Sequence, residues 1–257
     1  MTQTPPGFDR WIADAEARHL RDMTPTEVAR ALRALSSTYV ERRARLSGRG
    51  AFDTAGKRAA YALYYAPRRF QTLSYVLASL PAATGPLTII DVGCGTGAAS
   101  AAWALHAGPG AAIQAFDSHP WAVDETRATF QAFGLRGDVR RGAVGGTRGI
   151  QPWADGRGPH TRAILLSYLV NELTDDDRAA LLPSLLAAAA RGAHVLVMEP
   201  LSRKTSPWWN RWADAVIAAG GRADEWRTTL QLADITRRLG RAAGLDAAGA
   251  TGRTLYL

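Results

Sequence analysis

One run of nine residues constrains the fold of this chain more than any other feature. In Ile89-Ile90-Asp91-Val92-Gly93-Cys94-Gly95-Thr96-Gly97, an apolar, β-branched segment runs into three glycines at alternate positions. Residues 87–92 have the length and composition of a central parallel strand buried on both faces. The glycines permit a tight turn and close backbone approach to a ligand before a helix over residues 97–107. Alternatively, they only mark a tight strand-to-helix turn.

A second acidic residue strengthens the prediction of a binding site. The segment Gln114-Ala115-Phe116-Asp117 is a short strand that ends in a carboxylate. Asp117 follows the glycines by about 20 residues, the spacing at which doubly wound sheets place an acid on the ribose hydroxyls of a nucleotide. Together the two elements predict a site for a nucleotide-like cofactor.

The pattern Asp91-x-Gly93-x-Gly95-x-Gly97 resembles the first motif of class I S-adenosylmethionine (SAM)-dependent methyltransferases. A nicotinamide-binding Rossmann domain, which places its third glycine one position later, is the alternative. The resemblance implies SAM as cofactor and S-adenosylhomocysteine (SAH) as product. It also implies that Asp91 and the glycine backbone hold the methionine end, and that Asp117 holds the ribose. The full set of expected cofactor-binding residues is Asp91, Gly93, Cys94, Gly95, Gly97, Asp117, Ser118 and Ser167.

Strand and helix patterns alternate from residue 87 onward. Strands are expected at 87–92, 112–117, 138–141, 162–168 and 193–198, with helices at 97–107, 120–133 and 175–190. Helices at about 206–219 and 230–243 follow, and then a terminal pair of short segments at 245–250 and 254–257. This order predicts an α/β, Rossmann-like class I methyltransferase fold: a mostly parallel twisted sheet with helices on both faces.

The first part of the chain has helical patterns only. Thr24-Pro25-Thr26-Glu27 is a capping box, and apolar residues at helical spacing continue that helix to about Leu46. Two more helices are expected at 54–65 and 68–80, separated at Pro67. We therefore expect an N-terminal helical extension over residues 1–53 and a methyltransferase domain over residues 54–257.

Composition excludes several classes of protein. With 257 residues, 47% of them hydrophobic, the chain can bury a sizeable core. No signal peptide is recognisable, and the longest apolar run, 181–190, is too short for a membrane span, so a cytoplasmic location without membrane contact is expected. Cys94 is the single cysteine, and the five histidines lack ligand spacing. Thr174 before three aspartates is best explained as a helix cap, so no metal is expected.

The positive charge is concentrated in the N-terminal third. The chain has 31 basic and 23 acidic residues, and residues 1–85 hold 13 and 7 of them. Clusters at Arg42-Arg43-x-Arg45, Arg49, Lys57-Arg58 and Arg68-Arg69 can face phosphates, because guanidinium groups bind them bidentately. A solvated helical face explains them equally well.

Polar residues that follow the fourth strand are the catalytic candidates. Residues 163–168 run into Leu169-Val170-Asn171-Glu172, at the strand end that faces the methyl group in this fold. The Asn/Asp-Pro-Pro-aromatic turn of base-amine methyltransferases is missing, and Cys94 lies in the cofactor turn rather than where a C5-pyrimidine nucleophile would be needed. Tyr168, Asn171 and Glu172 remain, although Glu172 can equally be a charge at a helix start.

Tryptophans near the fifth strand are candidates for the substrate pocket. Trp208, Trp209 and Trp212 follow Glu199-Pro200 and can stack on a planar substrate. They can also form the face of a helix that covers the sheet. Trp121 is either core packing or the floor of an adenine site.

Three further blocks carry a closer resemblance: Gly56-Lys57-Arg58-Ala59-Ala60-Tyr61-Ala62-Leu63-Tyr64-Tyr65-Ala66-Pro67, residues 166–173, and residues 197–202. They resemble the mitochondrial small-ribosomal-subunit methyltransferase-like proteins and their bacterial relatives. The resemblance implies a pocket lined by Tyr61, Tyr65 and Arg68, with Trp208 and Trp209 as further substrate residues. Mitochondrial members carry cysteines that can hold an iron–sulfur cluster, which this chain lacks.

The expected activity is in-line transfer of the sulfonium methyl group of SAM to a nucleophile. Alignment of the two reactants would accelerate it. Basicity and resemblance favour ribosomal RNA or an assembly intermediate of the small ribosomal subunit as the partner. A small-molecule or peptide methyltransferase is the enzymatic alternative. A SAM-binding ribosome assembly factor without turnover is the third hypothesis.

Overall fold

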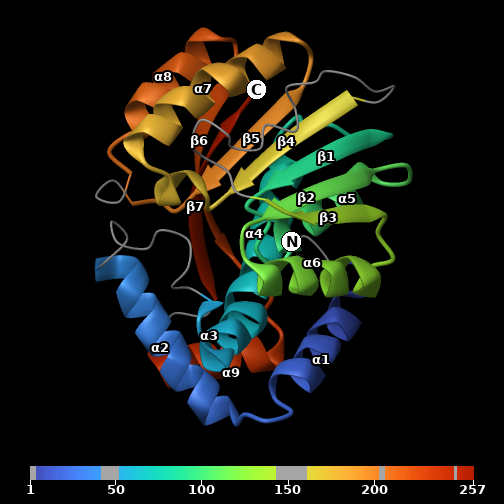
Figure 1. The fold of residues 1–257 in the computed structure, drawn as a ribbon, viewed down its shortest axis with the longest axis vertical. Helices are drawn as coiled ribbons and strands as arrows, with labels where there is room; N and C mark the ends of the chain where they lie inside the picture. Colours follow the sequence, from blue (N-terminus) through green and yellow to red (C-terminus); the bar gives the residue numbers. More distant parts are fainter. Residues whose placement is uncertain (1–3, 42–51, 143–160, 203–205, 246–247) are drawn as a thin grey trace.

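A seven-stranded sheet with the order β3-β2-β1-β4-β5-β7-β6 forms the centre of the molecule (Figure 1). The computed structural model describes residues 4–41, 52–142, 161–202, 206–245 and 248–257. β1 to β5 pair in parallel, whereas β7 is antiparallel to both of its neighbours. The strands are β1 Leu87–Val92, β2 Ala112–Asp117, β3 Gly137–Arg141, β4 Thr161–Ser167, β5 His194–Glu199, β6 Arg222–Thr229 and β7 Gly249–Tyr256.

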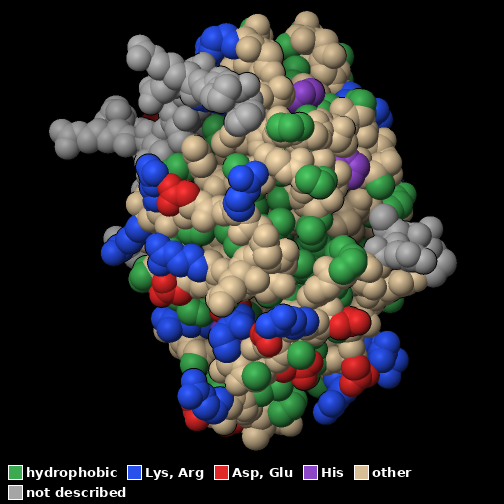
Figure 2. All heavy atoms as spheres, turned by 90° about the vertical axis from the view of Figure 1, so that its right-hand side faces the viewer, with side chains coloured by type: hydrophobic (Ala, Val, Ile, Leu, Met, Phe, Trp, Pro, Cys, Tyr) green, Lys and Arg blue, Asp and Glu red, His purple; other side chains and the backbone are tan. Residues whose placement is uncertain are grey.

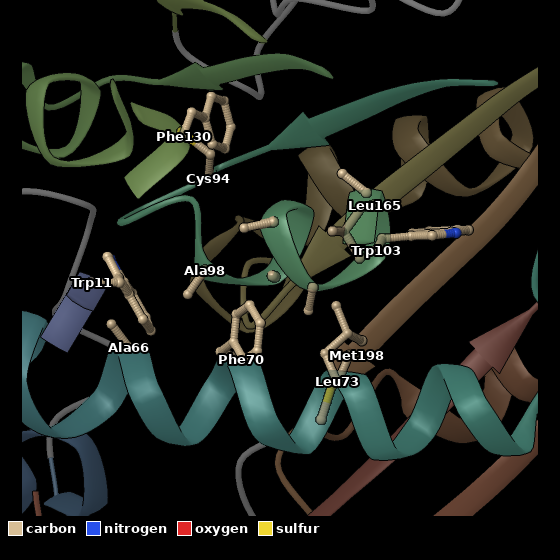
Figure 3. Close-up of a cluster of buried hydrophobic side chains, with 14 of the residues drawn as sticks. Trp11, Ala66, Phe70, Leu73, Cys94, Ala98, Trp103, Phe130, Leu165 and Met198 are labelled. Atoms are coloured by element: carbon tan, nitrogen blue, oxygen red, sulfur yellow. The ribbon is translucent and has the colours of Figure 1, made fainter. Parts of the chain in front are cut away.

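Helices cover both faces of this sheet. They are α1 Phe8–His19, α2 Pro25–Glu41, α3 Ala55–Ala60, η3 Tyr61–Tyr65, α4 Ala66–Ser79, α5 Ala98–Ala107, α6 Pro120–Ala132, η4 Val170–Glu172, α7 Asp175–Ala190, α8 Trp209–Ala218 and α9 Asp234–Ala243. Side chains that alternate along the strands feed two cores. Ile89 packs in the core with α4 and α5, and Ile90 packs in the core with α7 and α8. Figure 3 shows the first core, where Phe70 and Leu73 of α4 lie near Trp103 of α5. The predicted fold class is therefore confirmed.

The N-terminal helices belong to the first core. In Figure 1, α1, α2 and α3 lie with α9 at the lower end of the molecule. The predicted capping box is present: the Glu27 amide donates to the Thr24 hydroxyl at 3.3 Å, and the Thr24 amide donates to the Glu27 carboxylate at 2.8 Å. Trp11 of α1 reaches α6, where its indole N–H donates to the Thr129 hydroxyl at 3.1 Å. The division at residue 53 stays a prediction.

The expected break at Pro67 is wrong, because α3, η3 and α4 follow one another without interruption from residue 55 to residue 79. Proline cannot donate to the carbonyl four residues earlier and crowds it. Two features accommodate Pro67. The helix widens to a π-turn, in which the Ala66 amide donates to the Tyr61 carbonyl. The Leu63 carbonyl, which a non-proline residue 67 would bind, instead accepts from the buried Thr236 hydroxyl of α9 at 2.8 Å.

The C-terminal part differs from the expectation in two ways. Residues 222–229 form strand β6, for which no strand was predicted, and the expected pair at 245–250 and 254–257 is replaced by the single strand β7. β6 lies at the edge of the sheet and pairs only with β7 among the described strands. Its sequence, RADEWRTT, is rich in charge because an edge strand is solvated along its outer side. No helix in the described ranges is long and apolar enough to cross a membrane.

Candidate functional site

The glycine turn follows β1 and leads into α5, as predicted. Gly93, Gly95 and Gly97 have φ values of +71°, +58° and +70°, where other residues are strained. A Cβ on Gly97 would lie 2.7 Å from Cγ2 of Thr126 in α6, so the turn also needs glycine for packing. The Gly93 and Cys94 amides donate to the Phe116 carbonyl of β2 at 2.8 and 3.0 Å, which fixes the turn to the sheet.

Asp117 lies against this turn. Its Oδ2 accepts a hydrogen bond from the Gly95 amide at 2.9 Å, and its Oδ1 accepts one from the His119 amide at 2.8 Å. Burial raises the pKa of Asp117, and the two amide hydrogen bonds partly oppose that rise. The structure thus brings together the glycines and the carboxylate that the sequence analysis paired. Each carboxylate oxygen has room in its lone pairs for a further donor.

Asp91 is a buried carboxylate at the end of β1. It is 1% exposed, and neither oxygen has a partner at hydrogen-bond geometry within the described ranges, although the hydroxyl and amide of Ser100 lie close enough to influence it. Burial raises its pKa to about 7, and the negative charge of Asp117 adds to the rise, whereas the hydroxyl and amide of nearby Ser100 oppose it. A buried carboxyl group without partners is costly, and it suits a site that receives a donor or a cation from a ligand.

The only cysteine has a structural environment. Cys94 is buried, and its Sγ lies 3.3 Å from the Thr126 hydroxyl. Burial and the neighbouring Asp91 and Asp117 carboxylates raise the pKa of the thiol well above its usual value. The thiol therefore stays protonated at neutral pH, which makes it a poor nucleophile.

The carboxyl end of β4 lies beside the glycine turn that follows β1. β2 and β3 follow β1 on one side of it in the sheet, whereas β4 and β5 lie on its other side. The direction in which successive strands are added therefore reverses between β1 and β4. In open α/β sheets, ligands bind at the carboxyl ends of the strands at such a reversal. Ser167 ends β4 with a buried hydroxyl that has no partner in the described part of the chain. Tyr168 follows with a φ of +60°, a strained value for a tyrosine.

The π-turn η3 places tyrosines over the same edge. Tyr61 is 4% exposed, and its hydroxyl oxygen lies 3.6 Å from the position of a Cβ on Gly95. The Tyr65 ring centre is 5.6 Å from that of Tyr61. Because π-turns often accompany functional sites, this local widening is a structural signal that the sequence did not give.

Aromatic rings continue from Tyr61 toward Asp117. Phe52 has its ring centre 4.8 Å from that of Tyr61, 5.2 Å from that of His119 and 4.7 Å from that of Trp121. Trp121 is partly exposed, so it is not purely a core residue. These rings lie beside the carboxylate expected at the ribose, where a planar base can stack.

Asn171 takes part in a hydrogen-bond network rather than pointing freely into a pocket. Its Nδ2 donates to Glu199 Oε2 at 2.7 Å, and its Oδ1 accepts from the Ser206 hydroxyl at 2.6 Å and from the Trp208 indole at 2.9 Å. Glu199 ends β5 and is fully buried. The network ties η4, β5 and the start of α8 together, so a positioning role fits Asn171 better than proton transfer. Glu199 was not among the predicted site residues.

Other predicted site residues contact other elements or are exposed to solvent. Trp209 begins α8 and is buried in the second core, and the Arg253 Cζ lies 4.0 Å from its ring centre. Glu172 and Ser118 are exposed. Arg68 donates to the Gly249 carbonyl of β7 at 2.6 Å. The catalytic and substrate roles of Glu172, Trp209 and Arg68 and the cofactor role of Ser118 stay predictions.

The adjacent arginine, Arg69, is the one that reaches the site. Its Cζ lies 4.7 Å from the ring centre of Tyr61 and 4.4 Å from that of Tyr168. Its Nη1 donates to the Tyr61 hydroxyl. The sequence contained this residue in a basic cluster, but α4 had to be placed before Arg68 and Arg69 could be told apart.

Several of the basic side chains that suggested a nucleic-acid surface have partners within the chain. Arg58 donates to the Phe52 carbonyl, and Arg18 pairs with Glu125 at 2.7 Å. Figure 2 views the molecule from the right-hand side of Figure 1, and on the lower half of this face basic side chains are interspersed with acidic ones. The clusters at residues 42–45 and 49 lie outside the described residues.

Comparisons with solved structures find methyltransferases. An O-methyltransferase family protein from Burkholderia thailandensis is 15% identical, with a TM-score of 0.54 over 90% of this chain and 70% of that chain. The O-methyltransferase from Bacillus cereus in complex with SAH is 10% identical, with a TM-score of 0.46 over 97% and 99%. A SAM-dependent methyltransferase from Aquifex aeolicus is 15% identical, with a TM-score of 0.43 over 73% and 89%.

No family model and no curated protein matches the chain. The closer resemblance to the mitochondrial small-ribosomal-subunit proteins is therefore not supported by these comparisons. The sheet order and the similarity to the Burkholderia protein agree with the predicted architecture. The chain has the Rossmann-like fold of SAM-dependent methyltransferases.

Proposed function

We propose that the protein binds SAM and transfers its methyl group to an acceptor. The observation that carries the proposal is the pair of carboxylates at the glycine turn: Asp117 is hydrogen-bonded to the turn, and Asp91 is buried without a partner. Ribose hydroxyls are donors, and the methionine end of SAM carries an ammonium group. Both kinds of group suit carboxylate acceptors at the reversal point of the sheet.

The residues present fit this cofactor. Asp117 would accept the ribose hydroxyls, the glycine backbone would lie along the methionine part, and the rings of Phe52 and Trp121 would flank the adenine. When bound, SAM supplies an electrophilic methyl group on a sulfonium. The protein's contribution would be to align the acceptor with that methyl group and to exclude water, and Tyr168 at the end of β4 is our candidate for this role.

Direct binding measurements test the proposal. Titration calorimetry should detect SAM and SAH binding to the full chain. Asp117→Ala should weaken both by about ten- to a hundredfold, because hydrogen bonds to a charged acceptor contribute roughly 1.5–3 kcal/mol. The matched control is Asp124→Ala, which changes an exposed carboxylate of α6 that pairs with Arg127. Tight NAD binding by the wild type, or equal SAH binding by Asp117→Ala, would contradict the assignment.

For the acceptor, we propose RNA of the small ribosomal subunit. The support is the excess of 13 basic over 7 acidic residues before residue 86. Counterion release then requires RNA binding to weaken steeply with salt, by about 0.7–0.9 in the log–log slope per neutralised phosphate. Charge reversal at Arg42, Arg43 and Arg45 should flatten the slope and leave SAH affinity unchanged.

Two outcomes would replace this acceptor. Salt-independent binding, or no RNA binding by a folded sample, favours a small molecule or peptide. RNA binding without any SAH formation under saturating SAM favours an assembly factor that binds the cofactor without turnover. Measuring SAH release beside RNA affinity separates all three hypotheses.

A further inference from the structure

Arg69 of α4 lies near the ends of β1 and β4, the two parallel strands between which the strand order of the sheet reverses. It is the fourth residue of α4, and its Cζ lies over the rings of Tyr61 and Tyr168. Tyr61 reaches to within 3.6 Å of a Cβ position on Gly95, next to the end of β1. Tyr168 comes directly after β4. The guanidinium is therefore held between the ends of the two strands that flank the reversal.

The two tyrosines fix the orientation of this cation. Contacts with two aromatic rings restrict the orientation of a guanidinium. Both rings lie within 5 Å of Arg69 Cζ, and the Tyr61 hydroxyl accepts from Nη1. Tyr168 holds its ring in place at the cost of a positive φ of +60°. Backbone strain of this kind persists where the surrounding structure imposes it, and it clusters at ligand sites.

The neighbouring arginine shows that the placement is specific. Arg68 is directed to the other side of α4, where it contacts the Tyr64 ring at 5.1 Å and donates to the Gly249 carbonyl of β7. Arg68 thus fastens α4 to β7, whereas Arg69, the next residue of the same helix, contacts the tyrosine that lies beside the glycine turn.

The charge balance of the site calls for a cation at this place. The carboxylates of Asp91 and Asp117 suit the ammonium and the ribose of SAM, but the methionine end of SAM also carries a carboxylate. A carboxylate next to two acidic side chains would be repelled unless a cation lies beside it. A guanidinium presents paired N–H donors with the geometry of a carboxylate.

We propose that Arg69, held by Tyr61 and Tyr168, binds the carboxylate of the methionine part of SAM and SAH. The inference rests on the proposed function and assigns a residue to one group of that ligand. Tyr61 and Tyr168 act as positioning residues, because they orient the guanidinium.

Three ligands separate this role from a general effect on the site. SAM and SAH carry the carboxylate, whereas decarboxylated SAM lacks it and keeps the amine, the sulfonium and the nucleoside. Calorimetry on the full chain would compare the wild type with Arg69→Gln and with the control Arg10→Gln, which changes an exposed arginine of α1. We expect Arg69→Gln to weaken SAM and SAH by about ten- to a hundredfold and to leave decarboxylated SAM within about threefold of the wild type. Arg10→Gln should bind all three ligands as the wild type does.

The outcomes distinguish the inference from the proposed function. Wild-type protein that binds none of the ligands would refute SAM binding itself. If the wild type binds SAH and Arg69→Gln binds it equally well, only the assignment of Arg69 is overturned. The same holds if Arg69→Gln loses affinity for RNA but not for SAH. An equal loss for SAM and decarboxylated SAM also overturns it, since the carboxylate would then not be the group recognised. Retained binding of decarboxylated SAM reports in the same experiment that the variant is folded.

Discussion

Replacing Asp91 by Asn should stabilise the ligand-free protein, and the gain should grow with pH. The Asp91 carboxyl group is 1% exposed, has no hydrogen-bond partner in the described part of the chain, and lies near a second carboxylate. Such an environment penalises the ionised form. Asparagine has nearly the same shape and carries no charge at any pH, so the substitution removes the penalty and leaves the packing nearly unchanged.

The size of the effect follows from the pKa shift. The pKa of Asp91 rises from 3.8 to about 7. Between these values the unfolded chain has released the proton while the folded chain retains it, so the stability of the wild type falls as pH rises. Above pH 7 the loss is complete. A shift of about 3 pKa units corresponds to about 4 kcal/mol, an upper bound because local relaxation reduces it.

Urea unfolding of both proteins between pH 4 and pH 8.5 would measure this effect. Other titrating groups are common to the two proteins, so their contributions cancel in the difference. The free energy of unfolding of Asp91→Asn minus that of the wild type should increase from pH 4 to pH 7 and then level off, with a shift in Tm of roughly 10 °C at pH 8. Parallel pH profiles for the two proteins would refute the reasoning.

Three further predictions concern the framework of the site. Gly97→Ala should destabilise the protein by more than about 2 kcal/mol, because it adds a steric clash to a positive φ. The control is Gly134→Ala, which has a φ of +63° and no atom within 4 Å of the added Cβ, and which should lower the free energy of unfolding by about 1 kcal/mol. Thr236→Val should cost about 1–3 kcal/mol in urea unfolding, since the carbonyl it holds stays buried. Asn171→Ala should lower Tm, whereas Glu172→Ala should leave Tm within about 1 °C if its side chain is only an exposed charge.

The features that the sequence predicted well are local ones. The glycine turn, the capping box at Thr24 and the cap at Thr174 each depend on residues within a few positions of one another. Thr174 indeed accepts from the Asp177 amide at 3.1 Å at the start of α7. The pairing of Asp117 with the turn spans more of the chain, but adjacent parallel strands bring their carboxyl ends together by topology.

The features that the sequence did not predict depend on contacts between distant segments. Pro67 indicates a break only if no other group satisfies the carbonyl that it leaves, and Thr236, 169 positions later, supplies that group. Residues 222–229 lack the apolar alternation of a strand because β6 is an edge that relies on β7 for its pairing. The tryptophans after β5 fit two hypotheses by spacing, and only packing places Trp209 and Trp212 in the second core.

The location of unfavourable features connects the fold to the proposed activity. Tyr168 is the one non-glycine residue with a positive φ in the described ranges, and Asp91 and Ser167 have buried polar groups without partners there. All three lie at the ends of β1 and β4, the neighbouring strands between which the strand order reverses. Since native proteins satisfy most buried polar groups, three unfavourable features together at these strand ends fit a place that binds a ligand. A ligand with an ammonium and a carboxylate would relieve this arrangement, because Asp91 would gain a cation while Arg69 gained an anion. We therefore expect SAH to stabilise the wild type more than Asp91→Asn or Arg69→Gln at the same ligand concentration.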